Sequence, residues 1–509
     1  MKKTLTSGRS PEAAGFSGLV FVMAALFLAT LLSALDQTIF ATALPTIVGD
    51  LGGVGEMLWV TTAYVLAATV TMPVYGKLGD LLGHKPVFLW ALVLFIVGSA
   101  LGGLAPNMAL LIAARALQGL GGGGLMILSQ AILADLVPPR SRGTYMGILG
   151  GAWAFSSVVG PILGGWFAGE VGWRWAFWFN LPLGLAAILM SAAFLRVDAA
   201  REHRPRIDLL GIGPMASATT ALVLLISWGG RHFPWRSTPI ILLATVAVLF
   251  GAAFALAERK AVEPIMPLGL FRERDFVLTT ASALISSLAF MGVVAYLPTY
   301  LQMVTGLSPT RSGLLMVPLS MGILIASLSS GMSVSRTGRY RWMPAASCLI
   351  VGISLYLLSS LTPSSSVALI RSYLFVCGLG TGIGFQVLIV IVQNSFPITM
   401  VGTASAAHNF FRQIGASLGS ALVGTLFTQR LLSFLGDNLG PIGSPATEVV
   451  NVESLSPAIV AHMPEQVRSA IVASYSEALA PVYLYLVPGM ALATLLVLFI
   501  RKKSLGRES

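Results

Sequence analysis

Two oppositely charged residues lie inside long apolar stretches, where an unpaired charge is costly. Asp36 is the one carboxylate well within an apolar segment, and Arg115 lies within a later one. Both are about eight to ten residues from the same end of their segments, which at 1.5 Å per residue is a depth of roughly 12–15 Å. Equal depth predicts that they pair. An embedded carboxylate whose distance from an arginine changes can load and release a proton, although a fixed structural ion pair is the alternative.

The composition indicates a membrane protein. Of 509 residues 56% are apolar and 10% are charged, whereas soluble domains carry about 25% charge. Mean hydropathy is +0.84. This excludes soluble enzymes, nucleic-acid binders and fibrous proteins, so nucleic acid is not an expected partner and the bilayer is. The two cysteines, Cys348 and Cys377, lie in apolar runs and cannot build a disulfide framework or a metal site.

Fourteen segments are long and apolar enough to cross a bilayer, which takes about 20 residues. The first continues for too long to be a cleaved signal peptide, so we expect it to remain as a helix. The predicted spans are 18–45, 57–76, 86–105, 107–130, 143–168, 174–195, 208–228, 239–257, 276–301, 312–333, 342–361, 366–392, 402–428 and 480–500.

Lysine and arginine are distributed unevenly between the two sides of these spans. If residues 1–17 are cytoplasmic, the inner segments hold 22 of the 31 basic residues and the outer loops hold six. The positive-inside rule then places residues 1–17 and 501–509 in the cytoplasm. The outer loop 429–479 agrees with this, because it has five acids and two arginines.

A repeat with an offset of 255 residues divides the chain. Gly76 and Gly83 recur as Gly331 and Gly338. Further pairs at the same offset are Gly160 with Gly415 and Gly164 with Gly419. These matches predict two six-helix bundles, 18–195 and 276–500, joined by a linker at 196–275 that contains two inserted helices. Repeated bundles of this kind support alternating access around a midplane site.

The first repeated motif, residues 76–85, lies in a short inner turn. Gly76 and Gly83 permit close packing, and Lys85 ends the motif. Asp80 can accept hydrogen bonds from a helix N-terminus, where the dipole favours an anion. We expect Asp80 to dock near residues 402–403 and close the inner side. An ordinary basic loop is the alternative, but the recurrence favours a gate.

The second repeated motif combines a helix breaker with small residues. It consists of Gly160, Pro161, Gly164 and Gly165. Proline permits a kink, and glycines allow another helix to approach closely. Its repetition favours a moving interface with another helix over generic packing of small residues.

Polar and aromatic residues inside the spans are candidates for a substrate cavity. His408 and Arg412 are four residues apart and therefore share a helix face. The nearby arginine disfavours a protonated histidine, so His408 is a weak candidate for a proton carrier. The candidate cavity residues are Tyr64, Gln118, Trp153, Tyr296, Gln386, His408, Asn409, Phe410 and Arg412.

These motifs resemble those of the major facilitator superfamily, specifically its fourteen-span drug:proton antiporters. The similarity covers nearly the whole chain, in residues 35–45, 76–85, 115–121, 160–165, 173–184 and 410–415. It implies an all-α fold of two six-helix bundles plus two inserted helices. It also implies a transporter rather than an enzyme, with no cofactor beyond the proton gradient, and a monomer in the bacterial plasma membrane.

The chain departs from the family pattern in two places. Leu81 and His84 stand where the loop motif usually has arginine, which predicts a thinner charge network at the gate. Some multidrug members also carry an acid in the tenth span, and 312–333 contains none. Recognition of divalent cations is therefore not expected.

The expected function is export of amphiphilic small molecules, including drugs, by proton antiport. Asp36 would be the proton-linked switch, and Arg115 would stabilise its carboxylate while the two are paired. Within the same fold, a lipid or metabolite exporter and a nutrient symporter are the alternatives. A channel or a polytopic enzyme is disfavoured because no pore motif or catalytic constellation is visible.

Overall fold

The computed structural model describes residues 16–52, 56–195, 208–230, 232–306, 309–439, 460 and 463–501. This part of the chain is mostly helical, with turns and loops between the helices and one isolated bridge between Gly229 and Phe233. Its longer helices are α1 (Phe16–Leu51), α2 (Met57–Leu82), α3 (His84–Gly103), α4 (Met108–Leu136), α5 (Arg142–Trp166), α7 (Asn180–Phe194), α8 (Leu209–Trp228), α9 (Thr238–Lys260), α10 (Arg274–Thr305), α12 (Val317–Thr337), α13 (Trp342–Ser359), α14 (Val367–Ser395), α15 (Val401–Leu439), α18 (Glu465–Leu479) and α19 (Val487–Leu498).

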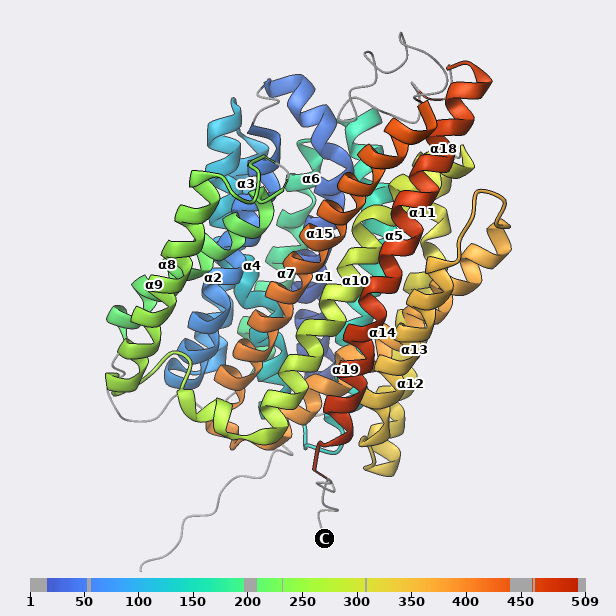
Figure 1. Ribbon diagram of the computed structural model, residues 1–509. Helices are drawn as coiled ribbons and strands as arrows, with labels where there is room; N and C mark the ends of the chain where they lie inside the picture. The colour runs from blue at the N-terminus through green and yellow to red at the C-terminus, as the bar shows by residue number, and fades with distance from the viewer. Residues whose placement is uncertain are drawn as a thin grey trace, which may run out of the picture.

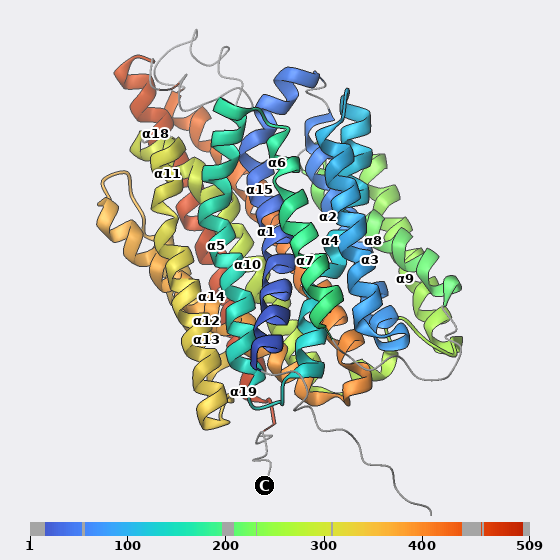
Figure 2. The ribbon, with the colours of Figure 1, turned by 180° about the vertical axis from the view of Figure 1, so that it is seen from behind.

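The long helices run side by side through the molecule (Figures 1 and 2). Helices α1 to α7 pack with one another, as do α10 to α19, and we call these groups the N half and the C half. The halves meet mainly along two helix pairs, α5 with α12 and α2 with α15, and to a smaller extent where α4 meets α15 and α5 meets α14. The hairpin of α8 and α9 lies outside the halves, at the left edge of Figure 1, and α8 contacts α2 and α15.

Thirteen of the described helical segments are long and apolar enough to cross a membrane. The one expected span that is not among them is 57–76, which forms α2. Helix α2 has 26 residues, about 39 Å at 1.5 Å each, so its length suffices. Its threonines, tyrosines, Lys77 and Asp80 lower its hydropathy. The number fourteen therefore stays a prediction.

The structure changes the bounds of several expected elements. The segment 174–195 is divided into a short α6 (Trp175–Trp178) and α7. Part of the expected outer loop 429–479 is helical, because α15 continues to Leu439 and α18 begins at Glu465. The expected tails 1–17 and 501–509 lie almost entirely outside the described residues. The same holds for residues 196–207 of the linker.

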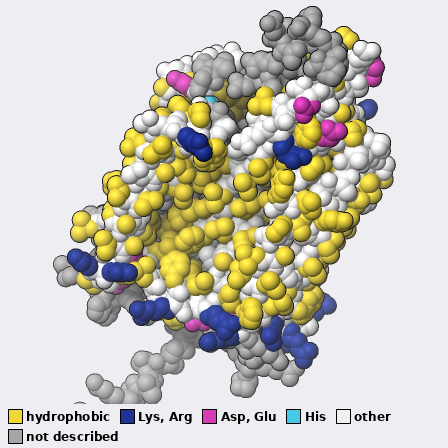
Figure 3. Space-filling model, in the orientation of Figure 1, with side chains coloured by type: hydrophobic (Ala, Val, Ile, Leu, Met, Phe, Trp, Pro, Cys, Tyr) yellow, Lys and Arg dark blue, Asp and Glu magenta, His cyan; other side chains and the backbone are white. Residues whose placement is uncertain are grey.

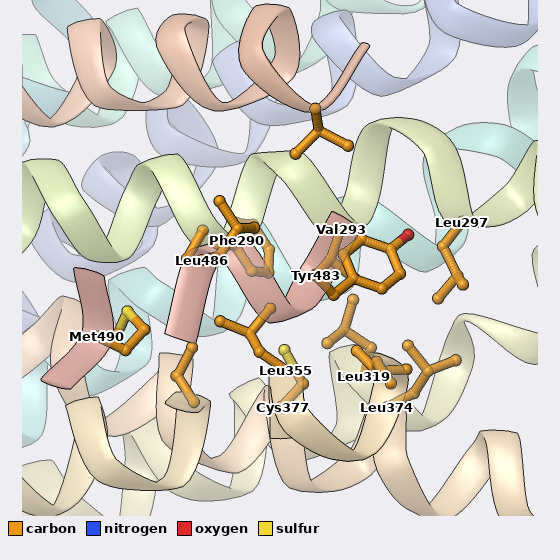
Figure 4. Packing of buried hydrophobic residues seen from close by; sticks show 14 of the residues in the cluster. Phe290, Val293, Leu297, Leu319, Leu355, Leu374, Cys377, Tyr483, Leu486 and Met490 are labelled. Atoms are coloured by element: carbon orange, nitrogen blue, oxygen red, sulfur yellow. The ribbon is translucent and has the colours of Figure 1, made fainter. Parts of the chain in front are cut away.

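Each half has its own apolar core. In the C half, side chains from α10, α12, α13, α14, α19 and the 3-10 turn Ala480–Leu486 pack around Val293, Leu355 and Cys377 (Figure 4). These three side chains are fully shielded from solvent. The N half has two core clusters, built mainly by α1 to α5 and α7. The cores are largely separate, as the two repeated bundles predict.

One end of the bundle is rich in basic residues, along the lower edge of Figure 3. We call it the basic end; α2, α4, α12 and α14 finish there, and α3, α5, α13 and α15 begin there. Apolar side chains cover the surface above it in the same view, as expected for a lipid-facing belt. The basic residues of the helix termini at this end include Lys77, Lys85, Arg140, Arg142, Arg336, Arg339 and Arg341.

Candidate functional site

Asp36 and Arg115 form the ion pair that their depth predicts. The Nη1 atom of Arg115 donates to Oδ2 of Asp36 at 2.5 Å, and the two side chains are 1% and 0% exposed. Gln118 joins both, because its Oε1 accepts from Arg115 at 2.7 Å and its Nε2 donates to Asp36 Oδ1 at 2.7 Å. A buried charge pair is stable only when its remaining polar atoms are also paired. This network meets that condition around α1 and α4.

Aromatic rings close the network on the arginine side. The guanidinium of Arg115 lies 4.2 Å from the ring centroid of Phe40 and 4.4 Å from that of Tyr64. The hydroxyl of Tyr64 is 3.2 Å from Ser33 Oγ. Tyr64 and Gln118 were expected in the substrate cavity, but the structure places both in the wall around the ion pair. Asp36 is therefore sealed from water in this conformation.

Asn180 is a further partner of Asp36 whose role the sequence did not reveal. Its Nδ2 lies 3.4 Å from Asp36 Oδ1 and 3.0 Å from Ser99 Oγ, and its side chain is fully buried. It is the first residue of α7, directly after an aromatic stretch. A single amide side chain at the start of an apolar segment could have indicated such a role, because a buried amide needs hydrogen-bond partners.

A small cavity lies between the halves near the middle of the helices. Its volume is 30 Å³, enough for about two water molecules but far below the roughly 300–1,000 Å³ of drug-sized sites. In this structure the central cavity is therefore too small to enclose a drug-sized molecule. Its lining residues are Thr30, Met126, Gln130, Leu149, Gly150, Trp153, Ile323, Phe385, Gln386, Ile389, His408, Asn409 and Arg412.

Five of the nine candidate cavity residues line the central cavity. They are Trp153, Gln386, His408, Asn409 and Arg412. Two others lie elsewhere, in addition to Tyr64 and Gln118. Tyr296 packs against Phe427 with ring centroids 5.9 Å apart, and Phe410 belongs to a buried cluster of the C half. Helical spacing places residues on a common face, but it does not say which partner that face meets.

Asp80 joins the halves at the basic end, by the predicted contact. Its carboxylate accepts hydrogen bonds from Gly402 N at 3.0 Å, Thr403 N at 2.7 Å and Thr403 Oγ1 at 2.6 Å. These donors belong to the first turn of α15, where the helix dipole favours an anion. A Cβ atom on Gly76 would collide with Gly402 and Ala406, so the glycine allows α2 to approach α15. The role of the Asp80 contact in gating stays a prediction.

His84 connects this contact to α4. Its Nδ1 lies 2.5 Å from Asp135 Oδ2, and its Nε2 lies 3.4 Å from Asp80 Oδ1. The histidine thus bridges two carboxylates at the position where the motif usually has arginine. The expected thinning of the charge network is partly offset by this bridge. Gly83 has φ +89° and turns the chain from α2 into α3, while Lys85 donates to Ala192 O at 2.9 Å.

Asp80→Asn is expected to reduce turnover about tenfold while changing substrate affinity less than about threefold. A hydrogen bond to a charged group contributes about 1.5–3 kcal/mol, and this one exists only when the basic end is closed. Kinetics of uptake into vesicles, together with equilibrium binding, measure the two effects. Asp50→Asn is the matched control, because Asp50 is exposed and bonds Trp173 and Arg174 in its own half. Equal losses of rate and affinity would contradict the prediction.

Helices α5 and α12 form the second contact at the basic end. Thr144 Oγ1 lies 2.8 Å from Ser335 Oγ, and Arg140 donates to the carbonyls of Ser335 and Arg336. A Cβ atom on Gly331 would lie 2.9 Å from the carbonyl carbon of Gly143 and closer still to its oxygen. Gly331 therefore lets α12 approach α5 as Gly76 lets α2 approach α15. The repeated glycines have equivalent structural roles.

The motif of Gly160 and Gly164 packs against α1, so the interface that it forms lies within the N half, and movement at this interface stays a prediction. Cβ atoms at these positions would collide with Thr38 and Thr42 of α1, within the N half. Their repeats Gly415 and Gly419 face α10 in the C half in the same way. A Cβ atom on Gly165 meets nothing within 4 Å, and Pro161 lies inside α5 without ending it. These faces stabilise each half internally.

Gly331→Ala is expected to open the basic end. The added methyl group collides with backbone of Gly143, which cannot move aside without separating α5 from α12. Labelling of a reporter, Ser335→Cys, by a membrane-impermeant maleimide should accelerate at least about fivefold, which corresponds to roughly 1 kcal/mol. Gly165→Ala is the control, since its Cβ has free space. Equal labelling rates in both backgrounds would refute the prediction.

Comparisons with known proteins agree with this architecture. The model of the Major Facilitator Superfamily matches residues 26–208 and 209–420. The chain belongs to this superfamily. It is therefore a transporter rather than an enzyme, with the all-α fold of that group. Such transporters generally need no cofactor, and in the described residues no three His, Cys, Asp or Glu side chains gather as a metal site.

The relatives include proteins named for drug transport. An MFS-type transporter of Mycobacterium tuberculosis is 39% identical, over 94% of this chain and 69% of its own length. Multidrug resistance protein 3 of Bacillus subtilis is 32% identical over 95% of both chains. Among solved structures, the proton:xylose symporter XylE aligns with TM-score 0.58 at 16% identity, over 95% of this chain and 96% of its own. This last likeness concerns the fold alone.

Proposed function

We propose that this chain exports amphiphilic small molecules in exchange for protons by alternating access. Its membrane would be the bacterial plasma membrane, with the basic end and both termini in the cytoplasm. The relatives named as multidrug transporters support the cargo class. The observation that carries the coupling mechanism is the buried network of Asp36, Arg115 and Gln118.

Asp36 is suited to proton coupling because its two states need different surroundings. The charged form is held by Arg115 and Gln118 at 2.5 and 2.7 Å. A protonated carboxyl has less need of Arg115, so proton uptake would release the arginine and loosen α1 from α4. A change in hydration or separation between the outward and inward states then couples protonation to the movement of the halves.

The gate contacts supply the second requirement of alternating access. Hydrogen bonds between the halves gather at the basic end and near the midplane, among them those of Asp80, Arg140 and Thr144. In this proposal they hold the cytoplasmic side closed while substrate leaves on the opposite side. They break when the halves rock, and the central cavity then opens to the cytoplasm.

The test uses purified protein in liposomes with an imposed pH gradient and an interior pH dye. Cationic, neutral and anionic amphiphiles are added in turn. Substrate-dependent proton movement in the opposite direction, lost in Asp36→Asn, supports antiport. Movement of protons and substrate in the same direction identifies a symporter. Substrate transport without any proton movement would refute the coupling and favour a metabolite or lipid exporter.

A further inference from the structure

One charge in the central cavity lacks a counter-charge. Arg412 lines this cavity and a neighbouring cavity of 10 Å³ inside the C half, and no Asp or Glu lines either. Among the described residues Arg412 forms no ion pair. Arginine stays protonated in proteins. The cavity therefore carries one positive charge that no acidic side chain in the described part of the chain neutralises.

The contacts of Arg412 leave most of its donors free. Its Nε donates to Asn409 Oδ1 at 3.2 Å, and its Nη2 lies 3.6 Å from the sulfur of Met126. Its guanidinium lies 5.1 Å from the ring centroid of Phe385. A guanidinium has five N–H groups, and these neutral contacts use two of them. Arg115, in contrast, is paired with the carboxylate of Asp36.

The surroundings suit the rest of an amphiphile. Trp153 and Phe385 give the lining flat apolar surface, and both are near Phe290, with ring centroids 5.8 and 5.6 Å away. The amide of Gln386 adds a donor and an acceptor on the same wall. Apolar walls with a few polar groups and one cation are the usual composition of a site for an acidic amphiphile.

We propose that the preferred cargo is an amphiphile with an acidic group, such as a carboxylate, which Arg412 binds in the central cavity. The inference rests on the proposed function in that this cavity is taken as the transport site. A neutral molecule leaves the guanidinium without an anion. A cation placed beside it meets like-charge repulsion in surroundings of low dielectric constant.

Equilibrium binding to protein in nanodiscs, without a pH gradient, tests the proposal with three probes on one dansyl scaffold. They are 6-(dansylamino)hexanoate, its uncharged methyl ester, and 5-(dansylamino)pentyl-trimethylammonium. The carboxylate should bind at least tenfold more tightly than the ester, and the cation should bind most weakly. Arg412→Gln should weaken carboxylate binding at least tenfold and ester binding less than threefold, whereas Arg412→Lys should keep the order. Arg371→Gln is the control, because Arg371 is exposed on α14.

Two results would overturn the assignment. One is equal or tighter binding of the cation, or no difference among the three probes. The other is an Arg412→Gln variant that weakens ester and carboxylate alike, because that is the effect of losing a structural contact to Asn409. Proton coupling is not needed for this binding. Failure of the antiport assay with the carboxylate preference intact would therefore refute the coupling and not the cargo class.

Discussion

Replacing Asp36 by Asn is expected to reduce the substrate gradient from several hundredfold to about one. With one pH unit and 100 mV across the membrane, one inward proton provides about 3.7 kcal/mol. For a neutral substrate exchanged one for one, this supports accumulation of about 500-fold. Asparagine cannot carry the proton, so the exchange loses its driving force. Substrate accumulation in energised vesicles measures the ratio directly.

The controls separate loss of coupling from loss of folding. Asp275→Asn removes another buried carboxylate, which accepts from Arg501 N at 3.0 Å at the basic end, and should keep the full gradient. Because Arg115 left without its anion can destabilise the protein by about 3–5 kcal/mol, the double variant Asp36→Asn/Arg115→Gln is included. It should fold and also lack the gradient. A full gradient in the folded Asp36→Asn protein would exclude Asp36 as the proton site.

An acidic cargo changes the energetics of the same cycle. Export of a monoanion against import of one proton moves two positive charges inward, worth about 4.6 kcal/mol per 100 mV. Transport of such a cargo should therefore produce a current and respond strongly to membrane potential. Exchange of a monovalent cation for one proton would be electroneutral. Currents in proteoliposomes thus report the charge of the cargo independently of binding.

The fold and the two principal contacts could be predicted because each depended on a strong physical constraint. A charge inside a membrane needs a partner at its own depth, which related Asp36 to Arg115. An acidic residue in a glycine-rich turn needs donors, and the first turn of a helix at the same end supplies them to Asp80. The repeat offset related the two contacts at the basic end, because Gly76 and Gly331 have equivalent places in the two halves.

Other features could not be predicted, because the sequence gives the composition of a helix face but not the partner that the face meets. Gly160 and Gly164 form a smooth stripe that predicts close packing, yet the stripe meets α1 of the same half. The contact between halves uses Gly143, which lies on another part of the same helix. Tyr64 was expected in the cavity for its aromatic ring, but the ring covers the guanidinium of Arg115. Only tertiary packing decides such choices.

A disulfide between cysteines introduced as Thr144→Cys and Ser335→Cys is expected to reduce substrate flux by more than about 90%. The native hydroxyl oxygens are 2.8 Å apart on opposite halves, and the sulfur atoms of a disulfide are about 2 Å apart, so a small adjustment brings cysteines at these positions together. The bond would hold the basic end closed, and alternating access requires that end to open. Reductant should restore transport, measured as substrate flux in oxidised and reduced vesicles.

The pair Asn438→Cys and Ser474→Cys provides the matched control. Asn438 Nδ2 lies 2.9 Å from Ser474 Oγ, and both residues belong to the C half; loss of both free thiols on oxidation verifies that this disulfide forms. This cross-link should leave transport unchanged, because the halves can still rock against each other. The native Cys348 and Cys377 are buried and free, so they do not compete for the oxidant. If the oxidised Thr144/Ser335 pair transported at the rate of this control, separation of α5 from α12 would not be part of the cycle.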